Sequence, residues 1–340
     1  MHSPSKMIPE YQYRVKDSSF ITPFFKQWLV APLFRLIPWG IPANIITIFS
    51  NLLMYAALYM ALAEWPGHTL RFILIPLLVF GYAIGDHMDG MQAKRTGTSS
   101  ALGELCDHYL DIFNNGILLY IICLSFHITH PVLIAFFLIA GYLPHAVMFY
   151  EQFTTKWLYF EKIGSLESLL ILILCIMLSA IEPVYRLALT PLVGGFTVAE
   201  VLFVLSSSGA FVTLARVVRR AHITDVWFYL FCALLVIVAY TATTFLSPTA
   251  IFYVITAYSG LYIGNLQRGH LADGKKRLPD FVVPLFMLAA FVFEALRQPV
   301  CIWGLCIYLV CHTLWIVGNA FRILRGFWVW KNPKELRIES

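Results

Sequence analysis

The stretch VWFYLFCALLVIVAYTATTFLSPTAIFYVITAYSGLYIGNLQ, residues 226–267, contains no Asp, Glu, Lys or Arg. A membrane-spanning helix needs roughly 20 apolar residues, so this stretch is long enough to cross a bilayer twice, with Pro248 at the turn. In the whole chain 59% of residues are hydrophobic and 13% are charged, whereas soluble domains average about 25% charged residues. The sequence therefore predicts a polytopic membrane protein.

Apolar runs separated by proline, glycine or charge clusters predict an all-α bundle of about ten membrane-spanning helices. Their approximate limits are 40–64, 69–92, 104–127, 131–152, 165–182, 198–219, 225–246, 248–267, 280–297 and 299–323. Ahead of them, FITPFFKQWLVAPLFRLIPW (20–39) is apolar but interrupted by Lys26, Pro32 and Arg35. This pattern favours an N-terminal amphipathic helix lying on the membrane surface.

The distribution of basic residues predicts the orientation of the bundle. If both termini are cytoplasmic, all 24 Lys and Arg residues except Arg71, Arg186 and Arg297 fall on the cytoplasmic side. Cytoplasmic loops of membrane proteins carry such an excess. We therefore expect cytoplasmic termini, in the endoplasmic reticulum or Golgi of a eukaryote or the inner membrane of a bacterium. The predicted units are an N-terminal segment (1–39), six helices (40–220), four additional helices (221–323) and a tail (324–340).

A second stretch, GDHMDGMQAKRTGTSSALGELCDHYLD (85–111), concentrates acidic residues in a chain otherwise poor in them. Asp86 and Asp89 are three residues apart at the end of the second predicted span, and Asp107 and Asp111 are four apart at the start of the third. Each pair therefore shares one helix face. Because a short polar loop joins the two helices, we expect them to be antiparallel neighbours whose carboxylates face each other.

Four carboxylates in this position need cations to offset them. Insertion of one Asp into a bilayer costs about 2.5–3.5 kcal/mol, and crowding adds repulsion. Two Mg²⁺ or Mn²⁺ ions bound by carboxylate oxygens would offset both, and a two-metal site suits displacement at phosphorus. Gly90, Ala93 and Gly103 are small enough for a phosphate to approach the backbone, and Lys94 and Arg95 would neutralise it. Simple pairing with loop charges, or a transporter's cation site, are the alternatives.

The pattern D-x2-D-G-x2-A-K-x8-G-x3-D-x3-D from Asp86 to Asp111 is similar to the signature of the CDP-alcohol phosphotransferases, with Lys94 where that family usually has Arg. Several segments resemble the eukaryotic-type choline/ethanolamine phosphotransferases within that family. They are YQYRVKDSSFITPF, PANIIT, DGMQAKRTGTSSALGELCDH and FYEQFTTKWLYFEKIGSLES, and the resemblance covers residues 11–170. Tyr109-Leu110 departs from the usual Gly-Cys, and these bulky side chains can reshape an acceptor pocket.

This resemblance implies an enzyme that moves phosphocholine or phosphoethanolamine from a CDP-alcohol to diacylglycerol or a similar lipid alcohol and releases CMP. It also implies a homodimer among membrane lipids, with no nucleic-acid partner, and a catalytic role for the six helices of residues 40–220. Two alternatives stay open. One uses CDP-diacylglycerol as donor and a small polar alcohol as acceptor, and the other is a cation-coupled transporter.

The resemblance also implies roles for individual residues. The implied metal ligands are Asp86, Asp89, Asp107 and Asp111. The candidates for the base that accepts the proton of the attacking hydroxyl are Asp111, His108 and Glu151. The implied nucleotide contacts are Asn44, Gly90, Ala93, Lys94 and Gly103. Glu167, at the start of the fifth predicted span, is expected to border the same polar vestibule.

Overall fold

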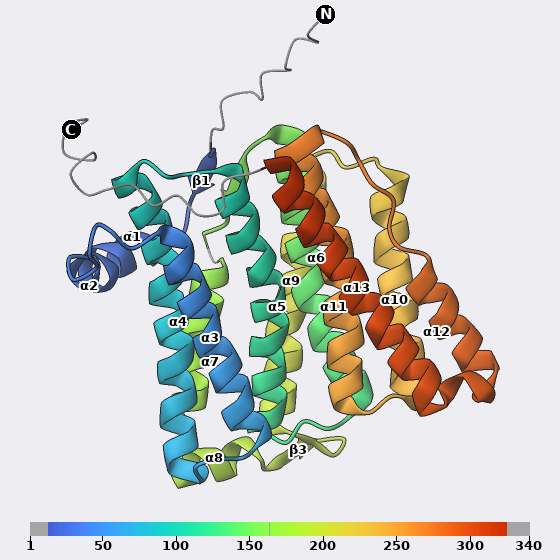
Figure 1. Cartoon of the computed structure of the whole chain (residues 1–340). Coiled ribbons are helices and arrows are strands. Elements are labelled where there is room, and N and C mark those ends of the chain that lie inside the picture. The colour runs from blue at the N-terminus through green and yellow to red at the C-terminus, as the bar shows by residue number, and fades with distance from the viewer. Residues whose placement is uncertain (1–12, 163, 325–340) are drawn as a thin grey trace, which may run out of the picture.

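The structure is a computed structural model that describes residues 13–162 and 164–324. Long helices run side by side between the two ends of a bundle (Figure 1). These helices are α3 (Ala43–Leu62), α4 (His68–Thr96), α5 (Ala101–Ser125), α6 (Pro131–Thr155), α9 (Val198–Arg220), α10 (Val226–Phe245), α11 (Pro248–Arg268) and α13 (Pro299–Leu324). We call the end at which α4 ends and α5 begins, the upper end in Figure 1, the site end.

Six of the described helices are long and apolar enough to cross a membrane, or seven if one bent helix pair counts as a span. The six are α3, α4 (His68–Arg95 of it), α6, α9, α10 and α13. Their outward faces carry exposed large apolar side chains, among them Phe49, Tyr59 and Trp303, as lipid contact requires. The chain thus has the helices of a membrane protein of the all-α class, and the number of ten spans stays a prediction.

Two predicted spans are interrupted. The fifth consists of α7 (Ser165–Leu178) and α8 (Glu182–Ala188), which meet at an angle of 115°. Pro183 lies in the first turn of α8, where its missing N–H is tolerated, and it cannot extend the preceding helix. The ninth is α12 (Val282–Val292), followed by a short 3₁₀ helix, η3 (Glu294–Arg297). There Arg297 donates to the carbonyl oxygens of Ala290 and Phe291, which lie in the last turn of α12.

The N-terminal helical segment consists of α1 (Thr22–Phe25), the π-helix η1 (Lys26–Val30) and α2 (Ala31–Phe34). Its last turns are seen nearly end-on beside α4 in Figure 1, so they cross the direction of the bundle. Trp28 is 70% exposed, whereas Phe25 and Val30 are buried against α3, α4 and α7. This amphipathic arrangement agrees with the expected interfacial helix, although its place at a membrane surface stays a prediction.

The described part of the chain also contains four short strands. β1 (Val15–Asp17) pairs in parallel with β2 (Leu158–Phe160), and β3 (Pro191–Val193) pairs antiparallel with β4 (Phe196–Thr197). The first pair joins the N-terminal segment to the loop between α6 and α7. This contact holds residues 15–17 beside the site end, next to the functional cavity described below.

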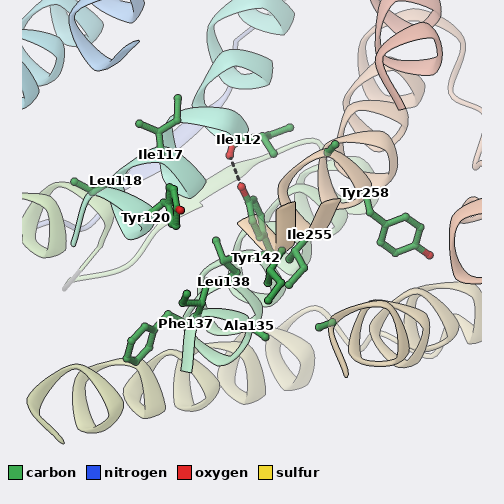
Figure 2. Packing of buried hydrophobic residues seen from close by; sticks show 14 of the residues in the cluster. Ile112, Ile117, Leu118, Tyr120, Ala135, Phe137, Leu138, Tyr142, Ile255 and Tyr258 are labelled. Carbon is green, nitrogen blue, oxygen red and sulfur yellow. Dashed lines mark hydrogen bonds between the residues drawn. The ribbon is translucent and has the colours of Figure 1, made fainter. Parts of the chain in front are cut away.

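The interior of the bundle is built where α5, α6 and α11 meet (Figure 2). Tyr142 of α6 is fully buried, and its hydroxyl donates to the carbonyl oxygen of Ile112 on α5 at 3.1 Å. Gly116 of α5 makes this contact possible, because a Cβ at that position would lie 2.2 Å from the Tyr142 hydroxyl oxygen and 2.6 Å from Oγ1 of Thr256 on α11. The three helices therefore approach closely at a glycine.

Replacing Gly116 by Ala is expected to destabilise the bundle by about 1–3 kcal/mol, because a buried tyrosine must move away from the new methyl group. Thermal unfolding of the purified protein in detergent measures the effect. Gly209→Ala on α9 is the control, since among the described residues no atom lies within 4 Å of its added Cβ. Tyr142→Phe in the Gly116→Ala protein should recover part of the loss. Equal stability of the Gly116→Ala and Gly209→Ala proteins would contradict this packing.

Candidate active site

The turn between α4 and α5 places the acidic stretch. Gly97 ends α4 with a left-handed backbone conformation (φ +61°), which glycine adopts without steric cost. Ser100 caps α5, with its side-chain oxygen accepting from the Gly103 backbone N–H at 3.1 Å. The chain therefore reverses within a few residues, and α5 runs back antiparallel to α4. Its backbone packs against α3, while α4 and α5 meet through side chains at the site end.

Three of the four aspartates meet at the site end. Asp86 on α4 and Asp107 and Asp111 on α5 each offer a carboxylate oxygen, and these oxygens all lie within 4.8 Å of one another. All three side chains are partly buried. The sequence predicted this approach from the spacing of the residues on two antiparallel helices. We call these three residues the carboxylate cluster.

Asp89 is buried beside the cluster and contacts α3. Its Oδ2 accepts a hydrogen bond of 2.5 Å from the hydroxyl of Thr47. It is not a member of the group of three whose oxygens lie within 4.8 Å of one another. A spacing of three residues turns two side chains about 60° apart around a helix, so Asp86 points toward α5 while Asp89 points toward α3.

Neutral polar groups hold Asp111. The hydroxyl of Tyr82, on α4, donates to its Oδ1 at 2.5 Å, and the amide of Asn114 lies 3.5 Å from the same atom. Asn114 also donates to the side chain of Asn51 on α3 at 2.7 Å. Helices α3, α4 and α5 therefore all contribute to the orientation of this one carboxylate.

The carboxylate cluster fits a hard divalent cation. Across residues 13–162 and 164–324, no Lys or Arg forms an ion pair with any of its members, and the one basic side chain within 4 Å is His87, whose Nδ1 is 3.6 Å from Asp86 Oδ2. Crowded carboxylates without a cation repel one another. All the donor atoms are oxygens at a spacing that one ion can bridge, which is the donor set that Mg²⁺ and Mn²⁺ prefer.

A cavity of about 690 Å³ opens over the carboxylate cluster. All five residues predicted to contact the nucleotide line it, namely Asn44, Gly90, Ala93, Lys94 and Gly103. Another part of the lining comes from the N-terminal segment, with Thr22, Pro23, Lys26, Gln27 and Ala31. Glu167 at the start of α7 also lines the cavity, and its Oε1 accepts from the Ser19 hydroxyl and the Ile21 N–H. The cavity thus has a face of small residues and a face built by the N-terminal helix.

His108 lies in the cavity wall next to the cluster. Its Nδ1 is 3.8 Å from Oε1 of Glu104, which also accepts a hydrogen bond of 2.8 Å from Gln152 of α6. Its Nε2 is 3.5 Å from the hydroxyl of Tyr13. With a carboxylate 3.8 Å from one ring nitrogen and a place in the cavity wall, His108 is positioned as a candidate for the base.

Glu151 has a different environment. Both of its carboxylate oxygens accept from Arg220 at the end of α9, at 2.8 and 2.7 Å, and its side chain is 2% exposed. Arg220 also pairs with Glu161 in the loop after α6. Although Glu151 is among the described residues, it does not line the cavity. The geometry therefore gives Glu151 an ion-pair contact between α6 and α9, and we assign it no role as a base below.

Arg95 and Tyr109 also point away from the cavity. Arg95 donates to the carbonyl oxygen of Ile37 at 2.8 Å and lies over the rings of Phe34 and Trp39, so it holds the end of the N-terminal segment. Tyr109 is buried against α11, and neither it nor Leu110, both within the described ranges, lines the cavity. Lys94 is therefore the member of the Lys-Arg pair that faces the site.

Sequence reasoning missed the neutral residues that orient the acids. Thr47, Tyr82 and Asn114 each hydrogen-bond an aspartate, and Lys26 and Tyr13 reach the cavity from the N-terminal segment. One signal was available, because Tyr82 lies one helical turn before Asp86 and thus shares its face. The partner of Asp89, by contrast, comes from a helix more than 40 residues earlier, and no local spacing indicates it.

The fold and the site together define a membrane-embedded helical protein whose cavity contains a carboxylate cluster able to hold a divalent cation. The sequence profile of the CDP-alcohol phosphatidyltransferase family matches residues 41–199, which include the whole cluster. Residues 41–199 are therefore similar to the domain that defines this family. The match falls within the predicted unit of residues 40–220.

Curated relatives agree with this family. An uncharacterized CDP-alcohol phosphatidyltransferase class-I family protein of Schizosaccharomyces pombe is 30% identical over 190 residues, which cover 52% of this chain and 48% of that protein. Cholinephosphotransferase 1 of Gallus gallus is 28% identical, over 52% of this chain and 54% of its own length. Choline/ethanolaminephosphotransferase 1 of Arabidopsis thaliana is 33% identical over 31% and 28%. The chain spans about half the length of the first two of these relatives.

Proposed function

We propose that this protein transfers phosphocholine or phosphoethanolamine from a CDP-alcohol to diacylglycerol or a similar lipid alcohol and releases CMP. The observation that carries the proposal is the carboxylate cluster beneath a cavity with one wall of small residues and one wall formed by an amphipathic helix. The names of the chicken and Arabidopsis relatives support choline and ethanolamine as the alcohols.

The two walls suit two different substrates. If Gly90 carried a Cβ, no described atom would lie within 4 Å of it, so the space beside the α4 backbone is open at this position. A diphosphate can therefore approach the backbone there, next to Lys94. On the other wall, Pro23, Gln27 and Ala31 line the cavity while Phe24 and Trp28 of the same segment are exposed. A helix that faces both the cavity and an apolar environment is a suitable border for a lipid acceptor.

The proposed reaction forms one bond and breaks one bond at phosphorus. The hydroxyl oxygen of the lipid attacks the phosphorus that carries the alcohol, the bond from that phosphorus to CMP breaks, and CMP leaves with the bridging oxygen. His108 and Asp111, which both line the cavity, are the candidate bases for the hydroxyl proton. Bound Mg²⁺ or Mn²⁺, as one ion or the two that we propose, supplies charge stabilisation for the phosphate oxygens. Asp86, Asp107 and Asp111, with Asp89 beside them, would hold it.

The test is CMP release by the purified full chain in lipid with diacylglycerol. CDP-choline and CDP-ethanolamine are offered with Mg²⁺ or Mn²⁺, and CDP-diacylglycerol is offered separately with inositol, serine or glycerol phosphate. We expect metal-dependent CMP from a CDP-amino-alcohol and none without metal. CMP only from CDP-diacylglycerol would reverse donor and acceptor, and no CMP from any pair would remove the proposal.

Replacing Lys94 by Arg is expected to keep or lower the KM for the CDP-alcohol, by up to about tenfold. Arg can bind phosphate through two parallel N–H donors, whereas Lys offers one point charge. Lys275→Arg, in the loop after α11 and outside the cavity, is the control for a surface Lys-to-Arg change. Initial rates of CMP release against donor concentration measure the effect. A complete loss of turnover in Lys94→Arg would show that this residue does not face the donor phosphates.

The organisation of the chain also remains a proposal. We propose that residues 40–220 form the catalytic core and that residues 221–323 are an additional helical unit, with cytoplasmic termini and a homodimeric assembly. The residues that line the cavity, from Tyr13 to Glu167, support the first part, because none of the described residues of α10–α13 contributes to it. The additional helices therefore do not contact a substrate in this cavity, and any contribution they make to the reaction is indirect.

A further inference from the structure

Helix α5 carries different chemistry on opposite faces. Asp107 and Asp111 face the cavity, whereas Tyr109 and Phe113 face α11. Two residues along an α-helix correspond to a rotation of about 200°, so Tyr109 necessarily lies opposite Asp107. Tyr109 is 5% exposed and packs edge-on against Phe113, with 5.4 Å between the ring centroids. On α5, the side opposite the carboxylates therefore carries two aromatic rings, Tyr109 and Phe113.

The rings of Tyr109 and Phe113 pack against two glycines of α11. A Cβ at Gly264 would lie 2.2 Å from Cε2 of Tyr109 and 2.9 Å from its Cδ2. A Cβ at Gly260 would lie 3.2 Å from Cζ of Phe113. The glycines are four residues apart on α11, as the aromatic residues are on α5, so the two helices match over one full turn. At Gly264 no larger residue fits without displacement of the Tyr109 ring.

Helix α11 is a firm support for α5. Every residue from Val254 to Gly264 is buried, and Tyr262 stacks on Phe231 of α10 with 3.9 Å between centroids. Tyr109 therefore contacts the most enclosed part of the additional helical unit. Since close-packed helices have few alternative arrangements, the position of α5 along α11 is set where Tyr109 fits against Gly264.

We propose that Tyr109 is a positioning residue: its fit against Gly264 fixes α5 so that Asp107 and Asp111 reach Asp86, and this is how the additional helices serve the site. The inference rests on the proposed function for its effect on turnover, but its effect on cation binding is independent of the substrate. A displacement of α5 by about 1 Å would separate the oxygens of the cluster and lower turnover by up to about a hundredfold.

The experiment compares two tyrosines of the same interface. Tyr109→Ala removes the ring beside the carboxylate cluster. Tyr120→Ala, the matched control, removes a buried ring that stacks on Phe252 of α11 with 4.6 Å between centroids, about three helical turns away. For each variant the Mn²⁺ concentration for half-maximal thermal stabilisation is measured without substrate. CMP release gives kcat and the KM for the donor.

We expect Tyr109→Ala to raise that Mn²⁺ concentration about tenfold and to lower kcat with little change in donor KM. Tyr120→Ala should lower the melting temperature and leave the Mn²⁺ concentration unchanged. Tyr109→Phe keeps the ring and should behave as wild type. Gly264→Ala should weaken Mn²⁺ binding strongly in wild type but only slightly in the Tyr109→Ala protein, because the added methyl then meets no ring.

Three results would overturn the inference. One is an equal Mn²⁺ response of the Tyr109→Ala and Tyr120→Ala proteins, and another is additive effects of Gly264→Ala and Tyr109→Ala. The third is a weakened response in Tyr109→Phe, since the hydroxyl and not the ring would then be responsible. If Tyr109→Ala does not fold, Gly264→Ala alone is compared with Tyr120→Ala. Absence of CMP from wild type with a normal Mn²⁺ response would remove the proposed function and leave this inference standing.

Discussion

Replacing Asp107 by Asn is expected to abolish metal-dependent CMP release, with a loss of at least about a thousandfold, while the bundle stays folded. Asn has the same shape but offers one neutral oxygen, so the cluster loses a charged ligand without a change in volume. Across the described ranges no Lys or Arg pairs with Asp107, so without a cation an ionised Asp107 is repelled by ionised Asp86 and Asp111. The metal-free variant should therefore unfold at the same temperature as wild type or higher.

Two measurements separate the outcomes of this substitution. CMP release reports turnover, and thermal unfolding with and without Mn²⁺ reports folding and cation binding. Asp273→Asn is the control, since Asp273 pairs with Arg277 in the loop after α11 and is outside the cavity. Metal-dependent CMP release by the Asp107→Asn protein would contradict the assignment of Asp107 as a ligand. A lower melting temperature without metal would show that Asp107 has a structural partner.

The local geometry of the site could be predicted from the sequence because it depends on helical spacing and one short turn. Asp107 and Asp111 are four residues apart, and Gly97 and Ser100 give the turn that returns α5 to α4. Spacing alone could not show that Asp89 turns to α3. The direction of the Asp89 side chain depends on Thr47 of α3, whose hydroxyl donates a hydrogen bond to the Asp89 carboxylate.

The tertiary partners of isolated polar residues were beyond the sequence. Glu151 lies at the site end of α6, which made it a reasonable candidate for a base, but Arg220 is 69 residues away and takes both of its oxygens. Tyr109 was expected to reshape the acceptor pocket because it is a bulky residue at a position where the resembling family usually has Gly, yet helical rotation directs it to Gly264. For both residues the helix could be predicted from the sequence. The neighbouring helix that each side chain contacts depends on tertiary packing.

The strand pair of the N-terminal segment shows a further limit of sequence patterns. β1 (Val15–Asp17) is three residues long, too short for the alternation of apolar and polar residues that indicates a strand. Its pairing with β2 nevertheless holds the segment against the cavity. The expected amphipathic helix, in contrast, extends over enough residues for Phe25 and Val30 to mark its buried face.

The contact between α6 and α9 gives the second large expected effect. Replacing Arg220 by Met should destabilise the protein by about 3 kcal/mol, because Glu151 would remain buried without its cation. The expectation is at the lower end of the usual range of about 3–5 kcal/mol, since the Arg220 side chain is 39% exposed and water screens part of the interaction. Thermal and denaturant unfolding in detergent measure the loss.

A double substitution distinguishes the buried charge from lost packing. Glu151→Gln in the Arg220→Met protein removes the unpaired charge, so it should recover at least half of the lost stability. Arg219→Met is the control, because Arg219 is the neighbouring base at the same helix end and forms no ion pair among the described residues. If Glu151 were the catalytic base, the double variant would be stable and inactive. Because the geometry assigns it to the α6–α9 contact, we expect it to be stable and to retain CMP release.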